Sequence, residues 1–333
     1  MNELLLGRPT AEAKCEKLFL AMLPGRLSLN ESKTLLLLLA KKGEEPSEIS
    51  GCLRAIRRLE PPRRVSLPFL IDVCGTGGDG KHTFNISTVS SFVIAAAGGY
   101  VAKHGNRSVS SRVGSSDLME ALGVRLDIPF RQMLNALHHC HLGYFHAPRY
   151  HPSFARVQGL RRELAIRTIF NLMGPLVNPV ELHYQMIGVS NLQWLEPLAE
   201  TLRRLRKRSA VFRSAEGLDE LSTREMSNIF YIEGKKIRSL CLDPKRLGFS
   251  KGRPHDYEGG DIKTNREIAL GILENRLRGP RRDVVLLNSG FALWLAGVTP
   301  SIKEGVEKSC WAIRTGQALE VLKALRRATH RRT

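Results

Sequence analysis

Two polar segments contain most of the residues that could do chemistry. The first is GTGGDGKHTFNIST, residues 75–88, and the second is KHGNRSVSSRVGSSD, residues 103–117. Each segment follows an apolar run and leads into an apolar helical pattern. Backbone N–H groups and hydroxyls at a helix N-terminus attract anions, because the helix dipole places partial positive charge there. The two segments predict neighbouring anion sites, which suit a ligand with two separated phosphate groups, although glycine and serine runs also form ordinary turns.

Two other phosphate motifs overlap the first segment, and both fit it less well. GTGGDG, residues 75–80, matches the dinucleotide pattern G-x-G-x-x-G, but that pattern also requires an acidic residue about 20 positions later. The next apolar run ends instead in Lys103 and His104. The same segment nearly matches the phosphate loop G-x-x-x-x-G-K-[ST], but His82 replaces the hydroxyl that would bind magnesium. We therefore favour the paired anion sites.

Three carboxylates could contact a cation or a sugar rather than a phosphate group. Asp79 lies inside the first segment, where it would repel phosphate unless it binds a ribose hydroxyl or reaches a metal through water. Asp219 and Glu220 follow the apolar run SAVF. Such a pair could cap a helix, or it could hold Mg²⁺ against a pyrophosphate, because hard cations take carboxylate oxygens together with substrate phosphates.

The elements that position these residues change in type near residue 60. Residues 31–42 and 45–59 have apolar residues at helical spacing, with Ser47 expected as an N-cap, and Pro61-Pro62 then interrupts the pattern. Beyond residue 67, apolar runs alternate with helical patterns, which indicates an α/β sheet with helices on its faces. Strands are expected in these runs: LPFLIDVCG (67–75), GGYVAKHG (98–105), YQMIGVS (184–190), SAVFRS (209–214) and DVVLLNS (283–289).

We predict a small helical domain, residues 1–65, completed by helices around residues 160–180. It joins a larger α/β domain, residues 66–333, with a mostly parallel central sheet flanked by helices.

The composition of the chain is that of a globular protein and gives no indication of a membrane or secreted protein. The 333 residues are 42% hydrophobic and 25% charged, as in an ordinary globular protein. The longest apolar run near the N-terminus, residues 34–40, is far shorter than the roughly 20 residues of a membrane span, and the first ten residues lack the features of a secretion signal. Six scattered cysteines without a C-x-x-C pair favour reduced thiols in the cytoplasm. The net charge of +19 suits an acidic partner, but no nucleic-acid-binding motif accompanies it, so binding to nucleic acid is not expected.

Together, several blocks resemble the anthranilate phosphoribosyltransferase family. They are the two polar segments, the second extended to Gly123, with RRELAIRTIFNLMGPLVNP (161–179) and GLDELS (217–222). The blocks cover nearly the whole chain, including the helical start at residues 35–51. The resemblance implies a Mg²⁺-dependent transfer of the phosphoribosyl group of phosphoribosyl pyrophosphate (PRPP) to the amine of anthranilate, in the second step of tryptophan biosynthesis. It also implies a homodimer formed through the helical domain.

The resemblance also implies roles for individual residues. PRPP would be bound by Gly75, Gly78, Asp79, Thr83, Asn85, Ile86, Ser87, Thr88, Lys103, His104, Gly105, Asn106, Arg107, Ser108, Val109, Ser110, Ser111 and Ser115. Anthranilate would be bound by Gly75, His104, Asn106, His151 and Arg161, with Arg161 facing its carboxylate. Magnesium would be held by Ser87, Asp219 and Glu220.

The residues agree with this chemistry. An aryl amine is neutral and nucleophilic at pH 7, so the reaction needs no strong general base, and stabilisation of the leaving pyrophosphate carries the rate. Two alternatives stay open. One is a basic, non-catalytic relative that binds nucleic acid, which the charge favours. The other is a nucleoside phosphorylase of related fold, whose second loop differs from KHGNR.

Overall fold

The computed structural model describes residues 2–108 and 112–331, so the expectations for Val109, Ser110 and Ser111 lie outside the described residues. The strands are β1 (Ile71–Gly75), β2 (Val101–Gly105), β3 (Leu142–His146), β4 (Tyr184–Gly188), β5 (Arg208–Ser214), β6 (Ser227–Glu233) and β7 (Lys236–Leu242). The α-helices are α1 (Asn2–Leu5), α2 (Glu12–Met22), α3 (Leu29–Lys42), α4 (Pro46–Leu59), α5 (Ile86–Ala96), α6 (Ser115–Ala121), α7 (Phe130–Cys140), α8 (Ala147–Tyr150), α9 (Phe154–Leu164), α10 (Phe170–Leu176), α11 (Leu195–Arg204), α12 (Ile262–Leu273), α13 (Pro280–Leu295), α14 (Ile302–Arg314) and α15 (Gln317–His330).

One mostly parallel sheet forms the centre of the molecule. Its strand order is β3-β2-β1-β4-β5-β6-β7, with β3 to β5 joined by parallel pairs and β6 and β7 added antiparallel. The expected α/β fold with a helical N-terminal part is therefore confirmed. Because β2 and β4 lie on opposite sides of β1, the connections after β1 and β4 run in opposite directions. Sheets of this kind bind ligands at such a switch point, beyond the carboxyl ends of the strands.

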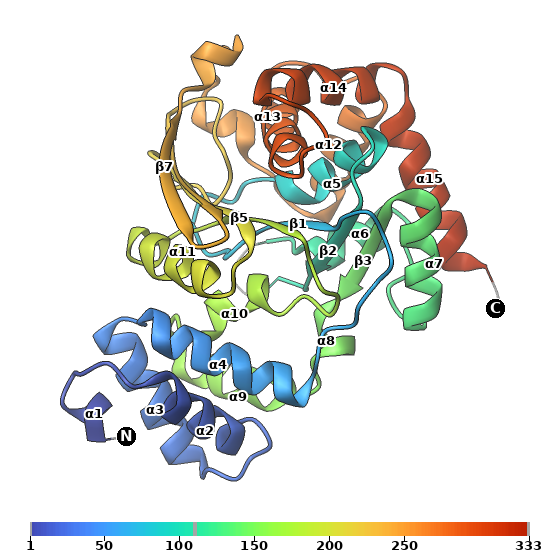
Figure 1. Ribbon diagram of the computed structural model, residues 1–333. Coiled ribbons are helices and arrows are strands. Elements are labelled where there is room, and N and C mark those ends of the chain that lie inside the picture. Colours follow the sequence, from blue (N-terminus) through green and yellow to red (C-terminus); the bar gives the residue numbers. More distant parts are fainter. Residues whose placement is uncertain (1, 109–111, 332–333) are drawn as a thin grey trace.

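The two faces of the sheet are covered by different helices (Figure 1). Met186 and Phe212 belong to a hydrophobic cluster shared with α5, α13 and α15. Ile187 and Val211, their neighbours in the strands, belong to a second cluster shared with α4, α10 and α11. This alternation follows from the strand itself, because successive side chains point to opposite faces. β4 and β5 therefore stabilise both layers.

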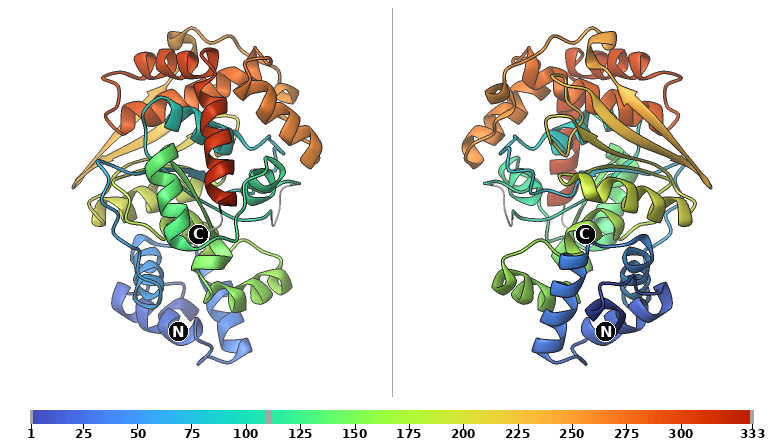
Figure 2. Two further views of the ribbon diagram at one scale, coloured as in Figure 1. Left: turned by 90° about the vertical axis from the view of Figure 1, so that its right-hand side faces the viewer. Right: turned by 90° about the vertical axis from the view of Figure 1, so that its left-hand side faces the viewer.

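The N-terminal helices pack with later segments of the chain, below the sheet in the views of Figures 1 and 2. Phe19 of α2 packs edge-to-face against Phe170 of α10, with ring centroids 5.8 Å apart. Val157 and Leu160 of α9 belong to the same hydrophobic cluster. These contacts agree with helices around residues 160–180 joining the N-terminal ones, while the domain boundary at residue 65 stays a prediction.

The expected strand at residues 283–289 is wrong. These residues lie inside α13, which begins after Gly279 with Pro280 in its first turn. Val284, Val285, Leu286 and Leu287 are all buried, since α13 is enclosed by neighbouring helices and the sheet. A helix without a polar face has no 3.6-residue periodicity to distinguish it from a buried strand.

The predicted N-cap of α4 is also misplaced. The cap is Glu45 rather than Ser47, because Pro46 takes the first helical position, where its missing N–H costs no hydrogen bond. Within the described residues, no helix is both long and apolar enough to cross a membrane. All six cysteines are among those residues and carry free thiols.

Candidate active site

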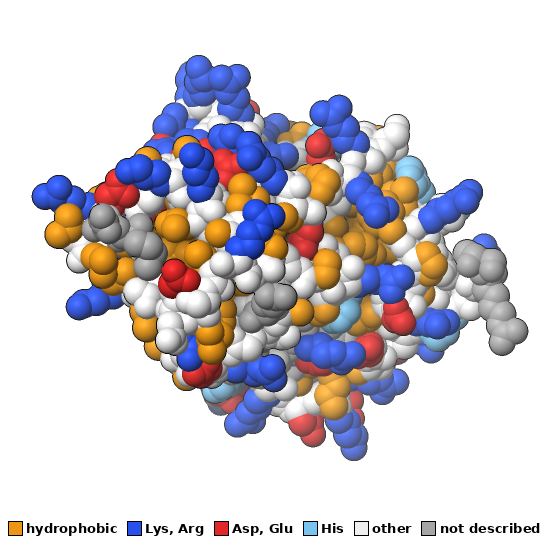
Figure 3. All heavy atoms as spheres, turned by 90° about the horizontal axis from the view of Figure 1, so that it is seen from below, with side chains coloured by type: hydrophobic (Ala, Val, Ile, Leu, Met, Phe, Trp, Pro, Cys, Tyr) orange, Lys and Arg blue, Asp and Glu red, His pale blue; other side chains and the backbone are white. Residues whose placement is uncertain are grey.

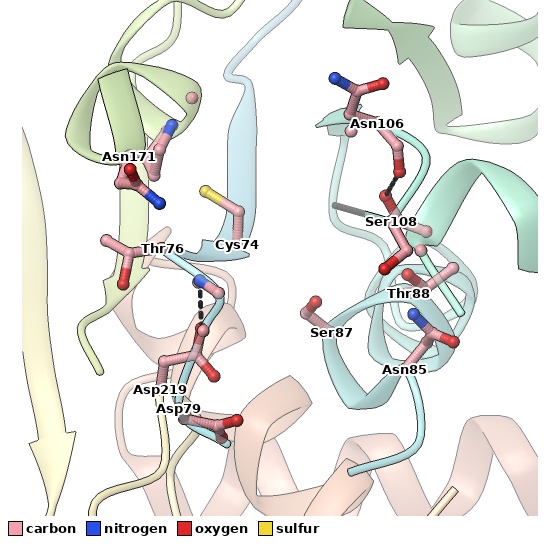
Figure 4. A pocket seen from close by; sticks show the side chains of 18 of the residues that line it. Cys74, Thr76, Asp79, Asn85, Ser87, Thr88, Asn106, Ser108, Asn171 and Asp219 are labelled. Carbon is pink, nitrogen blue, oxygen red and sulfur yellow. Dashed lines mark hydrogen bonds between the residues drawn. The ribbon is translucent and has the colours of Figure 1, made fainter. Parts of the chain in front are cut away.

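A cavity of about 330 Å³ opens beyond the carboxyl ends of β1 and β2. Its lining comes from the glycine-rich loop after β1, the start of α5, the loop after β2, and parts of α9, α10 and the loop after β5. Figure 4 shows two facing walls, with Cys74, Thr76, Asp79, Asn171 and Asp219 on one side and Asn85, Ser87, Thr88, Asn106 and Ser108 on the other. The cavity therefore lies at the switch point of the sheet.

Most predicted site residues line this one cavity. They are Gly75, Gly78, Asp79, Thr83, Asn85, Ile86, Ser87, Thr88, Lys103, His104, Gly105, Asn106, Arg107, Ser108, Ser115, Arg161, Asp219 and Glu220. These residues come from segments up to about 145 positions apart, and the sheet brings them together.

The glycine-rich loop adopts a conformation that only glycine takes up easily. Gly77, Gly78 and Gly80 have φ angles of 69°, 74° and 71°. Gly75, at the end of β1, has no space for a side chain, because an added Cβ would lie 2.1 Å from Oδ2 of Asp219. The loop therefore passes close against the carboxylate, and the backbone N–H of Gly77 donates to Oδ2 of Asp219 at 2.7 Å.

The first predicted anion site is the N-terminus of α5. Asn85 is the N-cap residue, but its side chain does not cap the helix and instead donates to the carbonyl of Val113 at 3.2 Å. The first turn contains no acidic residue. Oγ1 of Thr88 is buried and has no hydrogen-bond partner among the described residues. A buried polar atom of this kind usually has a partner, and a bound ligand would supply one here.

The second predicted anion site follows β2. Gly105 ends the strand, and an added Cβ would lie 2.3 Å from Oγ of Ser115 and from the hydroxyl of Tyr144. The N–H groups of Ser108 and Gly114 both donate to Oδ2 of Asp117, which holds the two ends of the loop together. Arg107 pairs with Asp117 at 3.0 Å, so part of the positive charge of Arg107 is already neutralised within the protein.

Lys103 links the two sites. Its side chain is only 2% exposed, and its Nζ donates to the carbonyl of Val73 at 2.7 Å and to Oγ of Ser87 at 3.3 Å. Its charge also acts on Asp72, which is fully buried and accepts a hydrogen bond from Asn178. A buried ammonium beside a helix N-terminus stabilises negative charge far more than the same group in water.

The carboxylates of Asp219 and Glu220 are poorly solvated. Burial, together with the neighbouring charge of Asp79, raises the pKa of Asp219 to about 7. Burial and the charge of Asp219 raise the pKa of Glu220 to about 8. Buried carboxylates that repel one another gain from a cation between them.

The donor set fits magnesium rather than a self-sufficient metal site. No group of three His, Cys, Asp or Glu side chains in residues 2–108 and 112–331 is arranged to hold a metal alone. Magnesium is commonly held by one or two carboxylates plus substrate phosphates, and its ligands are oxygens. Oδ2 of Asp79 is buried without a partner among the described residues, which leaves an acceptor for a cation or its water.

An aromatic and basic wall closes the other end of the cavity. It contains Phe154, Arg161, Phe170 and Gly174, with His104 beside them. Burial lowers the pKa of the Arg161 guanidinium, which makes a carboxylate partner more favourable. His151 does not line the cavity. It lies behind the wall, with ring centroids 5.1 Å from His104 and 5.3 Å from Phe154.

Sequence reasoning missed several lining residues. Thr76 and Gly77 are in the glycine-rich loop, while Asn171, Gly174 and Pro175 come from FNLMGPLVNP. Arg167, which precedes that segment, donates to the carbonyl of Gly78. The unusual composition of FNLMGPLVNP was the available indication in the sequence. Its distance along the chain from the glycine-rich loop does not predict that the two segments meet.

Comparisons with known proteins agree with this geometry. Residues 67–319 match the family model described as glycosyl transferase family, a/b domain. The chain is 40% identical over 326 residues to the anthranilate phosphoribosyltransferase of Persephonella marina, covering 96% of this chain and 95% of that protein. It is 39% identical over 326 residues to that of Bacillus cereus (strain B4264), covering 98% and 95%.

Solved structures give the same result. The crystal structure of anthranilate phosphoribosyltransferase from Thermus thermophilus superposes with a TM-score of 0.93 at 36% identity, covering 99% of each chain. That from Saccharomyces cerevisiae in complex with PRPP and Mg has a TM-score of 0.87 at 22% identity, covering 96% and 93%, and shows the shared fold.

Proposed function

The chain belongs to the anthranilate phosphoribosyltransferase family, and on this premise we propose that it transfers the phosphoribosyl group of PRPP to the amine of anthranilate. The products are N-(5-phosphoribosyl)anthranilate and pyrophosphate, in the second step of tryptophan biosynthesis. One observation carries the proposal most directly. Nζ of Lys103 lies 3.3 Å from Oγ of Ser87, so a buried cation and a helix N-terminus meet beside the carboxylates of Asp219 and Glu220.

The residues on the phosphate side would stabilise the leaving group. As the bond from C1 to the pyrophosphate oxygen breaks, negative charge grows on the pyrophosphate and the ribosyl carbon gains positive charge. Lys103 is already oriented before this charge develops, so little reorganisation is needed. We assign PRPP to the glycine-rich loop, the start of α5 and the loop after β2, as the sequence predicts.

Magnesium use follows from the same site. We propose that Ser87, Asp219 and Glu220 hold Mg²⁺ and that Asp79 reaches it or its water. The cation supplies charge neutralisation for the pyrophosphate. It would also offset the burial and the repulsion between carboxylates that raise the pKa values of Asp219 and Glu220.

The aromatic and basic wall would bind the acceptor. Arg161, which lines the cavity, would pair with the carboxylate of anthranilate, and Phe154 and Phe170 offer apolar surfaces for its ring. Asn106 and Gly75, which line the space between the two ends of the cavity, would contact the acceptor near its amine. The wall orients the amine toward C1 and excludes water, which would otherwise hydrolyse PRPP.

The experiment that tests this function follows the loss of anthranilate fluorescence on incubation with PRPP and Mg²⁺. Wild type is compared with the double variant Asp219→Ala/Glu220→Ala and with Arg161→Ala. The proposal expects magnesium-dependent consumption that both variants impair. Folded wild-type protein that consumes no anthranilate would refute it.

Two further features of the protein are part of the proposal. Leu5, Leu6, Leu29 and Leu37, in or next to the N-terminal helices, are 63%, 68%, 57% and 44% exposed, which supports a homodimer through the helical part. Six free cysteines support a reducing, cytoplasmic environment. Sedimentation at several concentrations tests the dimer.

The alternatives have less support. The second loop, KHGNR, argues against a nucleoside phosphorylase. An activity assay would distinguish the two enzymes, because a phosphorylase uses phosphate as the anion and the transferase releases pyrophosphate. A nucleic-acid-binding relative is favoured only by charge. On the face shown in Figure 3, Lys and Arg side chains are spread around the surface and do not form one stripe. Salt-dependent binding of single-stranded DNA is its direct test.

A further inference from the structure

A half-buried carboxylate, which the site as described so far does not use, lies behind the acceptor wall. Glu60 ends α4, and its side chain is 11% exposed. Oε2 of Glu60 lies 2.8 Å from Nδ1 of His151, and Oε1 accepts from the backbone N–H of Ser153 at 2.9 Å. Glu60 thereby joins the last turn of the N-terminal helices to the segment that carries the wall.

These contacts determine which nitrogen of each histidine carries a proton. An ionised carboxylate only accepts hydrogen bonds, so Nδ1 of His151 is the donor to Glu60. Nδ1 of His104 lies 3.0 Å from the carbonyl oxygen of Gly174, which also only accepts, so this Nδ1 carries a proton as well. In neutral rings, the remaining nitrogen, Nε2, is then unprotonated in both His104 and His151.

The two Nε2 atoms share an unusual environment. Both are buried, and neither has a hydrogen-bond partner among the described residues. The rings meet edge to face, with centroids 5.1 Å apart at an angle of 79°. His104 lines the cavity on the acceptor side, whereas His151 lies directly behind it. Buried acceptors without a donor are costly, and a donor that reaches this pair has to enter from the cavity.

We propose that Glu60 is a positioning residue for the transfer: its carboxylate fixes His151 in the Nδ1–H form, and the pair His104–His151 then accepts the proton that the amine loses. The proposal rests on the proposed function, because it takes the aryl amine as the hydrogen-bond donor to the unpaired Nε2 atoms of His104 and His151.

The step balances without a further reactant. The lone pair of the amine forms the bond to C1, and the bond from C1 to oxygen breaks with its electron pair on pyrophosphate. The nitrogen then has one hydrogen too many and is a strong acid. That proton passes to Nε2 of His104 and from the enzyme to water. A weak acceptor is sufficient, which agrees with the absence of any need for a strong base.

The charges around the pair decide its state before the reaction. Burial and the neighbouring charges of His151, Lys103 and His146 lower the pKa of His104 to about 3, so its Nε2 is unprotonated and free to accept. Burial of Glu60 is outweighed by its hydrogen bonds to His151 and Ser153, and the pKa of Glu60 is lowered. The ionised Glu60 is therefore an acceptor that keeps the proton of His151 on Nδ1.

Three variants of Glu60 separate positioning from packing. Glu60→Gln keeps the shape and removes the charge, Glu60→Ala removes both, and Glu60→Asp restores the charge on a shorter side chain. Glu44→Gln is the matched control, because Glu44 is a buried carboxylate between α3 and α4, accepting from Nε1 of Trp194 at 3.2 Å outside the cavity.

We expect Glu60→Gln to lower kcat by at least about tenfold while KM for PRPP changes by less than about twofold. The solvent deuterium isotope effect on kcat should rise above that of wild type, since proton removal becomes slower. Glu60→Asp should recover part of kcat, and Glu44→Gln should behave as wild type. Nitrogen chemical shifts of His151 should show the Nδ1–H form in wild type and a mixture of tautomers in Glu60→Gln.

Other outcomes would overturn the inference. One is Glu60→Gln with wild-type kcat. Another is an equal loss in Glu60→Gln and Glu60→Asp that follows their melting temperatures and leaves the isotope effect unchanged. If wild type shows no transfer at all, the proposed function fails. The histidine tautomers then still report separately whether Glu60 fixes His151.

Discussion

The backbone N–H of Gly77 donates to the carboxylate of Asp219 at 2.7 Å, and this bond joins loops that are 142 residues apart in sequence. The glycine-rich loop after β1 and the carboxylate loop after β5 are thereby held as one wall of the cavity (Figure 4). A change in either loop therefore affects the other, and the first prediction follows from this contact.

Gly75→Ala should disturb the carboxylate without touching a substrate-facing side chain. The added methyl group would lie 2.1 Å from Oδ2 and 2.6 Å from Cγ of Asp219, so Asp219 has to turn away and release Gly77. We expect kcat/KM for PRPP to fall by at least about tenfold, equivalent to about 1.4 kcal/mol, with a higher magnesium concentration at half-maximal rate. Gly159→Ala is the control, since an added Cβ there meets nothing within 4 Å. Unchanged magnesium dependence in Gly75→Ala would contradict the contact.

Arg161 and Arg162 are neighbours on α9 that should differ sharply. Arg161 lines the cavity, whereas Arg162 is exposed to solvent. Arg161→Ala should raise KM for anthranilate by about 10- to 100-fold, because a charge-assisted hydrogen bond to a carboxylate contributes about 1.5–3 kcal/mol. KM for PRPP should stay within about twofold. Steady-state kinetics with Arg162→Ala in parallel check the assignment, and equal effects of both changes would refute it.

Asp72 should make stability depend on pH. Burial raises its pKa to about 6 from the 3.8 of an unperturbed Asp, with Lys103 opposing the rise. The folded carboxyl holds its proton more tightly than the unfolded one, so its contribution favours the folded state at low pH. That contribution is lost as pH rises from about 4 to about 6.

Asp72 accepts hydrogen bonds from Nδ2 of Asn178 and from the backbone N–H of His104. Asp72→Asn removes the titration, and its new NH₂ group would face one of these two donors. We expect the variant to be less stable by about 1–3 kcal/mol, with the larger deficit at pH 4.5 and the smaller at pH 7.5. Urea denaturation of both proteins at the two pH values measures the difference. A deficit that grows with pH would show the opposite sign of linkage.

Arg167 should act through the glycine-rich loop. Its guanidinium donates to the carbonyl of Gly78 and lies over the ring of Trp194, 5.8 Å from its centroid. Arg167→Ala should free the loop and raise KM for PRPP by about 3- to 10-fold, since exposed contacts of this type contribute about 1 kcal/mol. KM for anthranilate should change less. Arg204→Ala, an exposed arginine of α11, is the control, and the prediction fails if both variants have the KM of wild type.

Local sequence was sufficient for much of the fold and for the phosphate side of the site. Strands such as residues 71–75 and 101–105 are short apolar runs followed by glycine, and the start of α5 is marked by polar residues before an apolar helix. These signals lie within about ten residues of one another. The conformations they predict depend on local backbone preferences and on periodicity.

The sequence alone predicted an anion-binding loop after each of two adjacent strands, and it singled out the carboxylate pair at Asp219 and Glu220. Only the tertiary structure decided what lies opposite them: Arg167 on Gly78, Glu60 behind His151, and α13 where a strand was expected. The reason is physical. The burial of a side chain, its charged neighbours and its close backbone contacts depend on segments that meet only when the sheet forms. The spacing of residues along the chain does not encode those distances.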